Sequence, residues 1–215
     1  MINFKYMKNI LPHLRKIQAH RKWVRHYCFG IGLYKQGLLH DLSKYSPIEF
    51  WEGVRYYQGD SSPIDAAKKE QGYSMAWFHH RGRNLHHYVS WIDNFDETGG
   101  TPILMPYKYF AEMVCDFLAA GRTYNGANFR FSKELAWWES KRSTCVMHER
   151  LIAALDYIFE ALADHETSFM NDGINGTKMV DEIFVKGYGY DLINNAYEHY
   201  VEMSDEEWRK SLCGD

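Results

Sequence analysis

The sequence has few of the features that mark several protein classes. Its four cysteines, Cys28, Cys115, Cys145 and Cys213, lie far apart without C-x-x-C spacing, which argues against a zinc ribbon or a disulfide framework. No apolar run approaches the roughly 18 residues needed to cross a bilayer. The first residues show neither the apolar core nor the cleavage pattern of a signal peptide. We therefore expect a cytoplasmic protein that does not use a membrane.

Charge and composition narrow the fold class further. The net charge of -3 gives no global signal for binding a nucleic-acid polymer. Hydrophobic residues make up 46% of the chain and aromatic residues 16%, which favours a packed core over disorder. Helical periodicity dominates, and strand-like alternation is nearly absent. We predict an all-α fold.

Apolar periodicity and capping signals define the helices that we expect. Their approximate ranges are 9–29, 34–44, 47–57, 75–80, 86–92, 106–121, 137–163 (as one or two helices), 192–200 and 205–212. Ser46-Pro47-Ile48-Glu49 has the pattern of a capping box with proline at the first helical position. Ser74 is expected to cap the helix at 75–80. We read 59–72 as a turn and a polar loop.

Histidine is the residue type present in excess. Eight of the eleven histidines fall in the first 90 residues, among them His20, His26, His40, His79, His80, His86 and His87. A solvated surface does not need so many imidazoles, whereas a metal site does. Imidazole and carboxylate ligands together suit iron, manganese, nickel, cobalt or zinc. We expect one or two divalent ions.

Three positions stand out as ligands before any family is considered. His40 and Asp41 are adjacent on a predicted helix, so they point about 100° apart and can both reach an ion held between helices. His20 lies between Ile17 and Val24 in an apolar stripe and should face inward. Asp116 lies within an apolar helix, where an unpaired carboxylate would be costly and an ion could compensate it.

Basic residues accompany these candidate ligands. Lys44 lies on the same side of the predicted helix as His40-Asp41, where it could hold a phosphate. Two histidine pairs, His79-His80 and His86-His87, flank a short turn and can converge on one point. That turn contains Arg81 and Arg83, whose guanidinium groups can each form two hydrogen bonds to phosphate oxygens.

The order of these residues resembles the HD-domain phosphohydrolase superfamily. The family's ligands occur in a fixed order along the chain, and this sequence has candidates in the same order. They are His20, then the pair His40-Asp41, then a histidine-rich segment, and finally Asp116. The run Leu38-Leu39-His40-Asp41-Leu42-Ser43-Lys44 is similar to the family's apolar-apolar-His-Asp-x-x-Lys form. The pattern also resembles a small bacterial group of HD-like proteins with an HHxxxNxHH segment. The resemblance implies an all-helical core, which we assign to residues 1–125, with a C-terminal helical extension at 126–215.

The resemblance also implies roles for individual residues. The implied metal ligands are His20, His40, Asp41, His79, His80, His86 and Asp116. Asp41 would bridge two ions, and Asp41 and Lys44 would be catalytic. Lys44, Arg81 and Arg83 would bind the substrate phosphate. The implied reaction is hydrolysis of a nucleotide or other small phosphate ester by metal-activated water. In the HD-GYP branch, however, a Glu stands where this chain has Arg81, and the Gly-Tyr-Pro signature is missing here.

Other interpretations remain open at this point. His20 could be a core histidine, His40-Asp41 a surface dipeptide, and Asp116 a structural acid in an ion pair. Lys44, Arg81 and Arg83 could be solvated charges, and His86 and His87 could serve in packing. With the same ligands the chain could be a di-iron oxygenase or a non-catalytic module that senses a metal or a nucleotide. The expected partner is a small phosphorylated substrate, and the sequence leaves a homodimer open.

Overall fold

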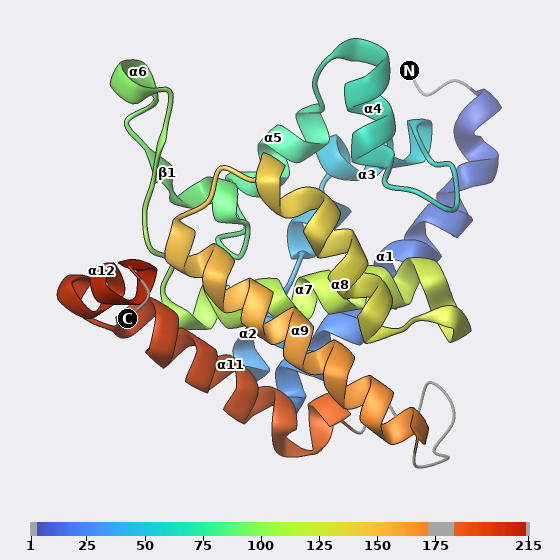
Figure 1. Cartoon of the computed structure of the whole chain (residues 1–215). Helices are drawn as coiled ribbons and strands as arrows, with labels where there is room; N and C mark the ends of the chain where they lie inside the picture. Colours follow the sequence, from blue (N-terminus) through green and yellow to red (C-terminus); the bar gives the residue numbers. More distant parts are fainter. Residues whose placement is uncertain (1–3, 172–182, 214–215) are drawn as a thin grey trace.

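The all-α prediction is confirmed by the computed structural model, which describes residues 4–171 and 183–213 (Figure 1). The α-helices are α1 (Ile10–Gly30), α2 (Tyr34–Leu39), α3 (Pro47–Arg55), α4 (Pro63–Gln71), α5 (Met75–Arg81), α6 (Phe95–Thr98), α7 (Tyr107–Asn125), α8 (Phe131–Lys141), α9 (Glu149–Asn171), α11 (Gly189–Tyr197) and α12 (Asp205–Cys213). Within the described ranges, no helix is both long and apolar enough to cross a membrane.

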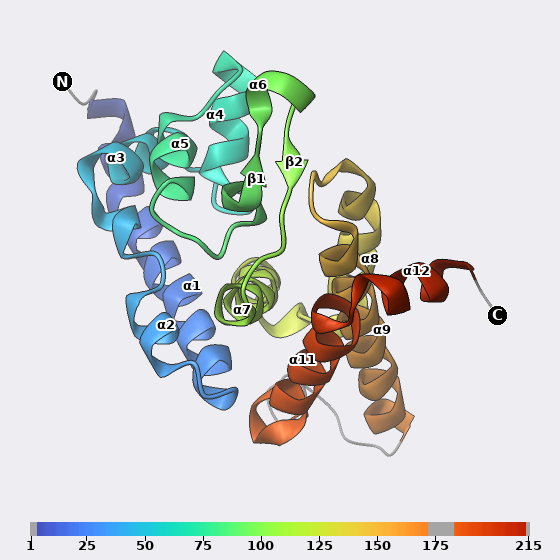
Figure 2. The same cartoon turned by 90° about the vertical axis from the view of Figure 1, so that its left-hand side faces the viewer.

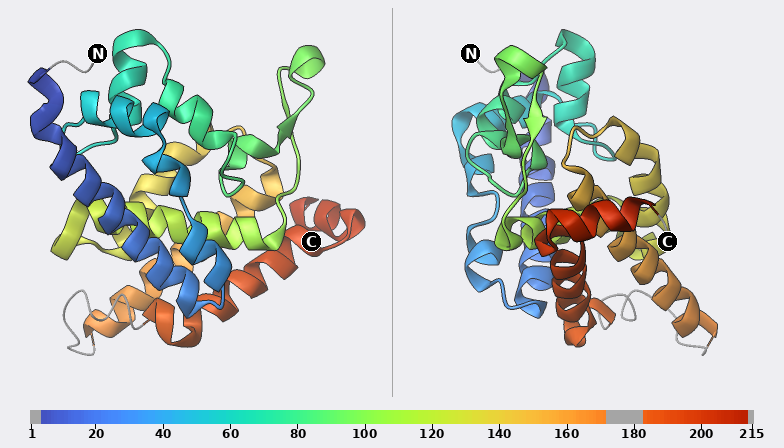
Figure 3. Two further views of the ribbon diagram at one scale, coloured as in Figure 1. Left: turned by 180° about the vertical axis from the view of Figure 1, so that it is seen from behind. Right: turned by 60° about the vertical axis from the view of Figure 1, so that its left-hand side comes forward.

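Helix α7 runs through the middle of the molecule. Figure 2 shows it nearly end-on, with α1, α2, α3 and α5 on one side and α8, α9 and α11 on the other. Seen from behind, α1 crosses α7 (Figure 3). One apolar cluster joins both sides, from Val24 on α1 and Phe110 on α7 to Leu155 on α9 and Ile193 on α11. The proposed boundary at residue 125 stays a prediction, since the core runs across it.

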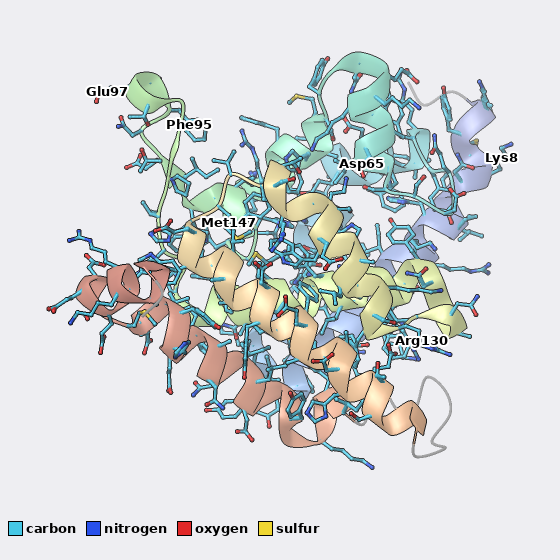
Figure 4. All side chains as sticks on the ribbon, viewed as in Figure 1. Lys8, Asp65, Phe95, Glu97, Arg130 and Met147 are labelled. Carbon is cyan, nitrogen blue, oxygen red and sulfur yellow. The ribbon has the colours of Figure 1, made fainter. Side chains whose placement is uncertain are left out.

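A short antiparallel ribbon is the one exception to the helical pattern in the described part of the chain. Strands β1 (Ile92–Asp93) and β2 (Thr101–Pro102) pair at the base of an excursion that carries α6 at its tip. In Figure 4 the side chains of Phe95 and Glu97 extend from this tip, away from the helical body. Of the helix predicted at 86–92, only Tyr88–Trp91 are helical, as a 3₁₀ turn, and Ile92 begins β1. His86 and His87 lie in a turn, which the Trp91 Nε1 hydrogen bond to the Leu85 carbonyl holds in place.

Several helix boundaries follow the local signals, and two predictions need correction. Ser74 caps α5 by accepting a hydrogen bond from Trp77 N at 3.0 Å, as expected. The polar loop at 59–72 contains α4, which starts at Ser62-Pro63 with the same signal as the start of α3. Glu49 forms no capping box with Ser46 because its carboxylate faces the interior instead.

The C-terminal segments divide as follows. The range 137–163 belongs to two helices, α8 and α9, separated by a 3₁₀ turn at Arg142–Thr144. The stretch 164–189, which the sequence leaves ambiguous, continues α9 to Asn171 and includes a π-helical turn at Phe184–Tyr188. Residues 172–182 of that stretch lie outside the described residues. Helix α11 is followed by a second π-helical turn at Glu198–Glu202.

Candidate metal centre

The His40-Asp41 pair lies in a turn rather than on a helix. Helix α2 ends at Leu39, and a 3₁₀ turn (Leu42–Tyr45) follows the pair. Asp41 adopts a left-handed conformation with φ 55° and ψ 26°, which costs an L-amino acid roughly 1–3 kcal/mol. Arg21 holds the turn by donating hydrogen bonds to the carbonyls of Leu38 and His40. The prediction that His40 and Asp41 share a helix is wrong, because both lie in this turn. The turn directs both side chains inward.

One group of candidate ligands gathers around the Asp41 Oδ2 atom. It comprises His20 from α1, His40, Asp41 and Asp116 from α7. His20 Nε2 lies 3.3 Å from His40 Nε2 and 2.9 Å from Asp116 Oδ1. His40 Nε2 lies 3.3 Å from Asp41 Oδ2. Ligand atoms held about 2.1 Å from one ion are about 3.0–3.4 Å apart in octahedral or tetrahedral geometry. The spacing therefore fits a shared ion.

A second group forms on the other side of the same carboxylate. It comprises Asp41, His80 from α5, and His86 and His87 from the turn that follows. Asp41 Oδ1 lies 3.2 Å from His80 Nε2 and 3.6 Å from His86 Nε2. One oxygen of Asp41 thus faces each group. This is the arrangement of a carboxylate that bridges two ions.

Two buried glutamates orient the imidazole rings. Glu112 Oε1 accepts hydrogen bonds from His40 Nδ1 at 2.9 Å and from His86 Nδ1 at 3.2 Å. Glu49 Oε2 accepts one from His80 Nδ1 at 2.8 Å. Because a carboxylate only accepts, each Nδ1 carries the proton, and the Nε2 lone pair of a neutral ring points into the cluster. Metal-binding histidines are commonly oriented in this way.

The cluster contains buried atoms without hydrogen-bond partners. Neither carboxylate oxygen of Asp41 accepts a hydrogen bond of suitable geometry, and His86 Nε2 and His87 Nε2 also lack partners. A lone pair that faces a carboxylate oxygen at 3.2 Å, as between His80 and Asp41, is repelled unless a cation or a proton lies between them. The residues therefore fit a bound cation chemically as well as geometrically.

Without an ion, protons stabilise these carboxylates. Burial alone would lower the pKa of His40, but the negative charge of Asp41 and hydrogen bonds to carboxylates raise it well above its usual value. Burial alone would raise the pKa of Asp116, but hydrogen bonds from His20 and His40 hold it well below its usual value. The pKa of Asp41 is likewise held well below its usual value, because the charges of His40 and Lys44 outweigh burial. A divalent ion would take the place of these protons.

Lys44 lies beside the cluster and a cavity opens there. Its ammonium group is 2.6 Å from Asp41 Oδ2, so it adds a positive charge next to the bridging carboxylate. Lys44, His20 and Asp116 all line a cavity of about 240 Å³. A substrate in this cavity would meet the first ligand group and a cation together.

The remaining predicted site residues lie around the cluster in different ways. His79 Nδ1 contacts Glu49 Oε1 at 2.6 Å and belongs to neither of the two ligand groups. Arg81 stacks on the Phe78 ring, and Arg81 and Arg83 line a second, more open cavity on the outer side of α5. The structure therefore does not bring the two arginines together with Lys44.

Two functional candidates escaped the sequence prediction. Glu112 precedes Asp116 by one helical turn on α7, so both point to the same side, and this spacing was a usable signal. Glu49 was hidden by its apparent role in a capping box. Asp156 and Asp164 are two further acids in the sequence after Asp116 that could be considered as ligands. Asp156 lies on α9, where it accepts hydrogen bonds from Trp138 and Arg142. Asp164 is also on α9 and is exposed.

Comparisons with known proteins place the chain in a family. No curated protein and no solved structure matches the sequence. One family model matches residues 9–161, a range that includes all the ligands of both groups as well as Glu49 and Glu112. Its description is "Family of unknown function (DUF5662)". The match spans well over half of the chain, and the protein belongs to this family.

Proposed function

We propose that this protein is a metal-dependent phosphohydrolase of the HD type that acts on a small phosphate ester. The observation that carries the proposal is the Asp41 carboxylate, which directs Oδ2 toward His20 and His40 and Oδ1 toward His80 and His86. A carboxylate between two sets of imidazoles supports a two-ion centre. Such centres stabilise both the attacking and the leaving oxygen in phosphoryl transfer.

The protein groups have distinct tasks in this proposal. His20, His40 and Asp116 hold one ion, and His80 and His86 hold the other. His87 has its Nε2 directed into the second group and serves as a further ligand candidate. When bound, the ions would lower the pKa of a coordinated water and offset charge on the phosphoryl oxygens.

Lys44 and the two glutamates complete the proposed machinery. Lys44 attracts the substrate phosphate to the cavity side of the centre and keeps its charge, because Asp41 raises its pKa despite burial. Glu112 and Glu49 orient the imidazoles by holding Nδ1. They are positioning residues, because neither is needed to touch the substrate. The order of ligands along the chain adds the HD resemblance to this support.

Metal analysis with an activity panel tests the proposal. The wild type should bind close to two ions per chain and hydrolyse phosphomonoesters with manganese, iron, cobalt or nickel. Asp41→Asn should lose most of the metal and at least a thousandfold in kcat/KM, since the bridging charge is removed without a change in size. Asp164→Asn, on the exposed side of α9, is the matched control and should behave as the wild type.

Three results separate this proposal from its rivals. Negligible metal in the wild type would refute the centre itself. Stoichiometric metal without hydrolysis of any ester would favour a binding module. A second enzyme class, a di-iron oxygenase, is supported by the nitrogen-rich ligand set of four or five imidazoles and two carboxylates. Oxygen uptake by the iron-loaded protein, together with an iron spectrum that changes on addition of substrate, would favour that class.

A further inference from the structure

The cavity beside the first ligand group has two long walls. They are stripes of residues spaced three or four apart, His13, Ile17 and His20 on α1 and Asp116, Ala120 and Tyr124 on α7. This spacing places each stripe on one helical face. Lys44 lines the cavity with His20 and Asp116, so one end adjoins the proposed metal centre. Tyr124 is 40% exposed, and it marks a side that is open to solvent.

Away from Lys44, the lining is small and largely apolar. Gly53, Ala76 and Ile64 contribute to it, the last from the start of α4, the helix on which Asp65 is labelled in Figure 4. Asp116 lines the cavity at the metal centre, and the other two acidic residues of the lining are already engaged. Glu49 holds His79 and His80, and Glu52 accepts hydrogen bonds from the first backbone amides of α5. An uncharged ligand group therefore suits this space better than a charged one.

His13 differs from the other polar residues that line this part of the cavity, Lys16, Ser62 and Thr123, which are only half-buried. Its side chain is buried, and its Nδ1 atom has no hydrogen-bond partner. The ring is fixed between Phe50 and Tyr57, with centroid distances of 5.5 Å and 5.8 Å. It also lies directly over Gly53, where any Cβ would overlap it. Burial, aided by the charge of Lys44, lowers the pKa of His13 to about 4, so the ring is neutral at pH 7.

A neutral, fixed ring with an unused nitrogen is a hydrogen-bonding site for a ligand. The cavity volume of about 240 Å³ is below the roughly 300–1,000 Å³ of sites for drug-sized molecules, which favours a small ligand. We propose that this cavity holds the organic group of a small phosphomonoester. That group is compact and uncharged, and one polar atom of it bonds His13 while the phosphate lies at Lys44. The assignment rests on the phosphohydrolase function proposed above.

Phosphonates test the cavity without turnover, because their C–P bond replaces the ester bond. The metal-loaded full chain is titrated calorimetrically with phenylphosphonate, methylphosphonate and inorganic phosphate. Phenylphosphonate should bind about tenfold to a hundredfold more tightly than methylphosphonate, because its ring is buried in the cavity. Ala120→Leu fills the cavity and should abolish this preference, because it weakens the binding of phenylphosphonate far more than that of methylphosphonate. The control Ala136→Leu, on the exposed side of α8, should keep the preference.

A second pair of variants tests His13. Relative to phenylphosphonate, 4-hydroxyphenylphosphonate should gain about threefold to tenfold in affinity from a hydrogen bond to the ring. His13→Leu should remove this gain, and His13→Asn should retain part of it, since the asparagine amide can occupy the position of Nδ1. Melting temperatures of all variants establish that they fold.

These measurements distinguish failure of the cavity assignment from failure of the proposed hydrolase function. The cavity assignment is overturned if phenylphosphonate binds no more tightly than methylphosphonate, or if Ala120→Leu leaves the preference intact. Hydrolysis of phenyl phosphate is measured in parallel. A preference that Ala120→Leu abolishes, without hydrolysis, supports the cavity and refutes the hydrolase. Hydrolysis with no such preference refutes the cavity assignment alone.

Discussion

The two sides of α7 bury their acidic side chains in different ways. On the α1 side, Asp41 is 1% exposed, yet neither of its oxygens accepts a well-formed hydrogen bond. On the α9 side, Glu166 is 2% exposed and accepts bonds from Phe131 N, Ser132 N and Ser132 Oγ at 2.9–3.2 Å. Glu166 thus satisfies the free amides at the start of α8. The acid on the α9 side caps a helix, whereas Asp41 contacts the Lys44 ammonium and the imidazoles of the proposed metal centre.

The surroundings of Asp41 and Glu166 also differ. Asp41 lies among imidazoles from several elements and in a strained backbone conformation. Glu166 lies in a regular helix beside an apolar core that includes Leu155, Phe159 and Leu162. Strain and unpaired polar atoms persist only where some other interaction compensates them. The difference supports our proposal that the α1 side carries the function and the α9 side contributes stability.

The largest expected effect is stabilisation by metal. An ion that binds only the folded chain adds about 4 kcal/mol when its free concentration is a thousand times the Kd, a shift of roughly 8–16 °C in Tm for a chain of this size. Calorimetric melting with and without a chelator measures it. Asp41→Asn should abolish the shift, and Asp164→Asn should keep it. A shift that survives in Asp41→Asn would mean that metal stabilises some other part of the molecule.

Removal of core volume on the α9 side should lower the stability of the chain and leave its metal binding unchanged. Leu155→Ala leaves a cavity at a fully buried position and should cost about 3 kcal/mol in the free energy of unfolding. Metal content per folded chain should remain that of the wild type. Denaturant unfolding and metal analysis of the same sample test both parts. Loss of metal together with stability would contradict the separation of the two sides.

The next expected effect is a pH dependence of folding stability that arises from Glu134 on α8. Burial raises the pKa of Glu134 to about 8, so its carboxyl is protonated in the folded chain at pH 7 but ionised in the unfolded chain. The unfolded state binds fewer protons above pH 4.5, so this group destabilises the fold increasingly as pH rises toward 8. Glu134→Gln removes the ionisation. Its stability relative to wild type should therefore rise by on the order of 2 kcal/mol between pH 5 and pH 7. A constant difference across this range would contradict the shifted pKa.

The sequence located most residues of the buried His/Asp cluster better than the path of the backbone that carries them. His20 and Asp116 were recognisable because a polar residue interrupts a regular apolar stripe in a long helix. The turn at His40-Asp41 was not, because a left-handed aspartate breaks local preferences and is maintained by tertiary contacts such as those from Arg21. Glu49 was assigned to a local capping role, although two imidazoles from α5 provide stronger, charge-assisted partners. Local rules do not include such long-range partners.

The smallest expected effect comes from a matched pair of serines, one on each side of α7. Ser74 caps α5, and its hydroxyl bonds Glu52, whereas Ser132 is the second residue of α8 and its hydroxyl bonds Glu166. Replacing either serine with alanine removes a hydrogen bond at a helix start and should cost about 1 kcal/mol in unfolding free energy. Of these two helices, only α5 carries a ligand of the proposed centre, His80. Ser74→Ala should therefore also weaken metal binding, by about tenfold, since groups that position ligands affect affinity on this scale.

Competition with a chromogenic chelator measures the affinity of both serine variants. Ser132→Ala should leave the metal Kd unchanged while it destabilises the chain to a similar extent, so that stability alone does not account for a change in affinity. Equal loss of affinity in both variants would mean that the centre responds to the whole fold. Loss in Ser74→Ala alone would show that the start of α5 fixes the position of His80. The boundary between the functional and the structural side would then run along α7, the helix whose one face carries Glu112 and Asp116 while other residues pack in the shared core.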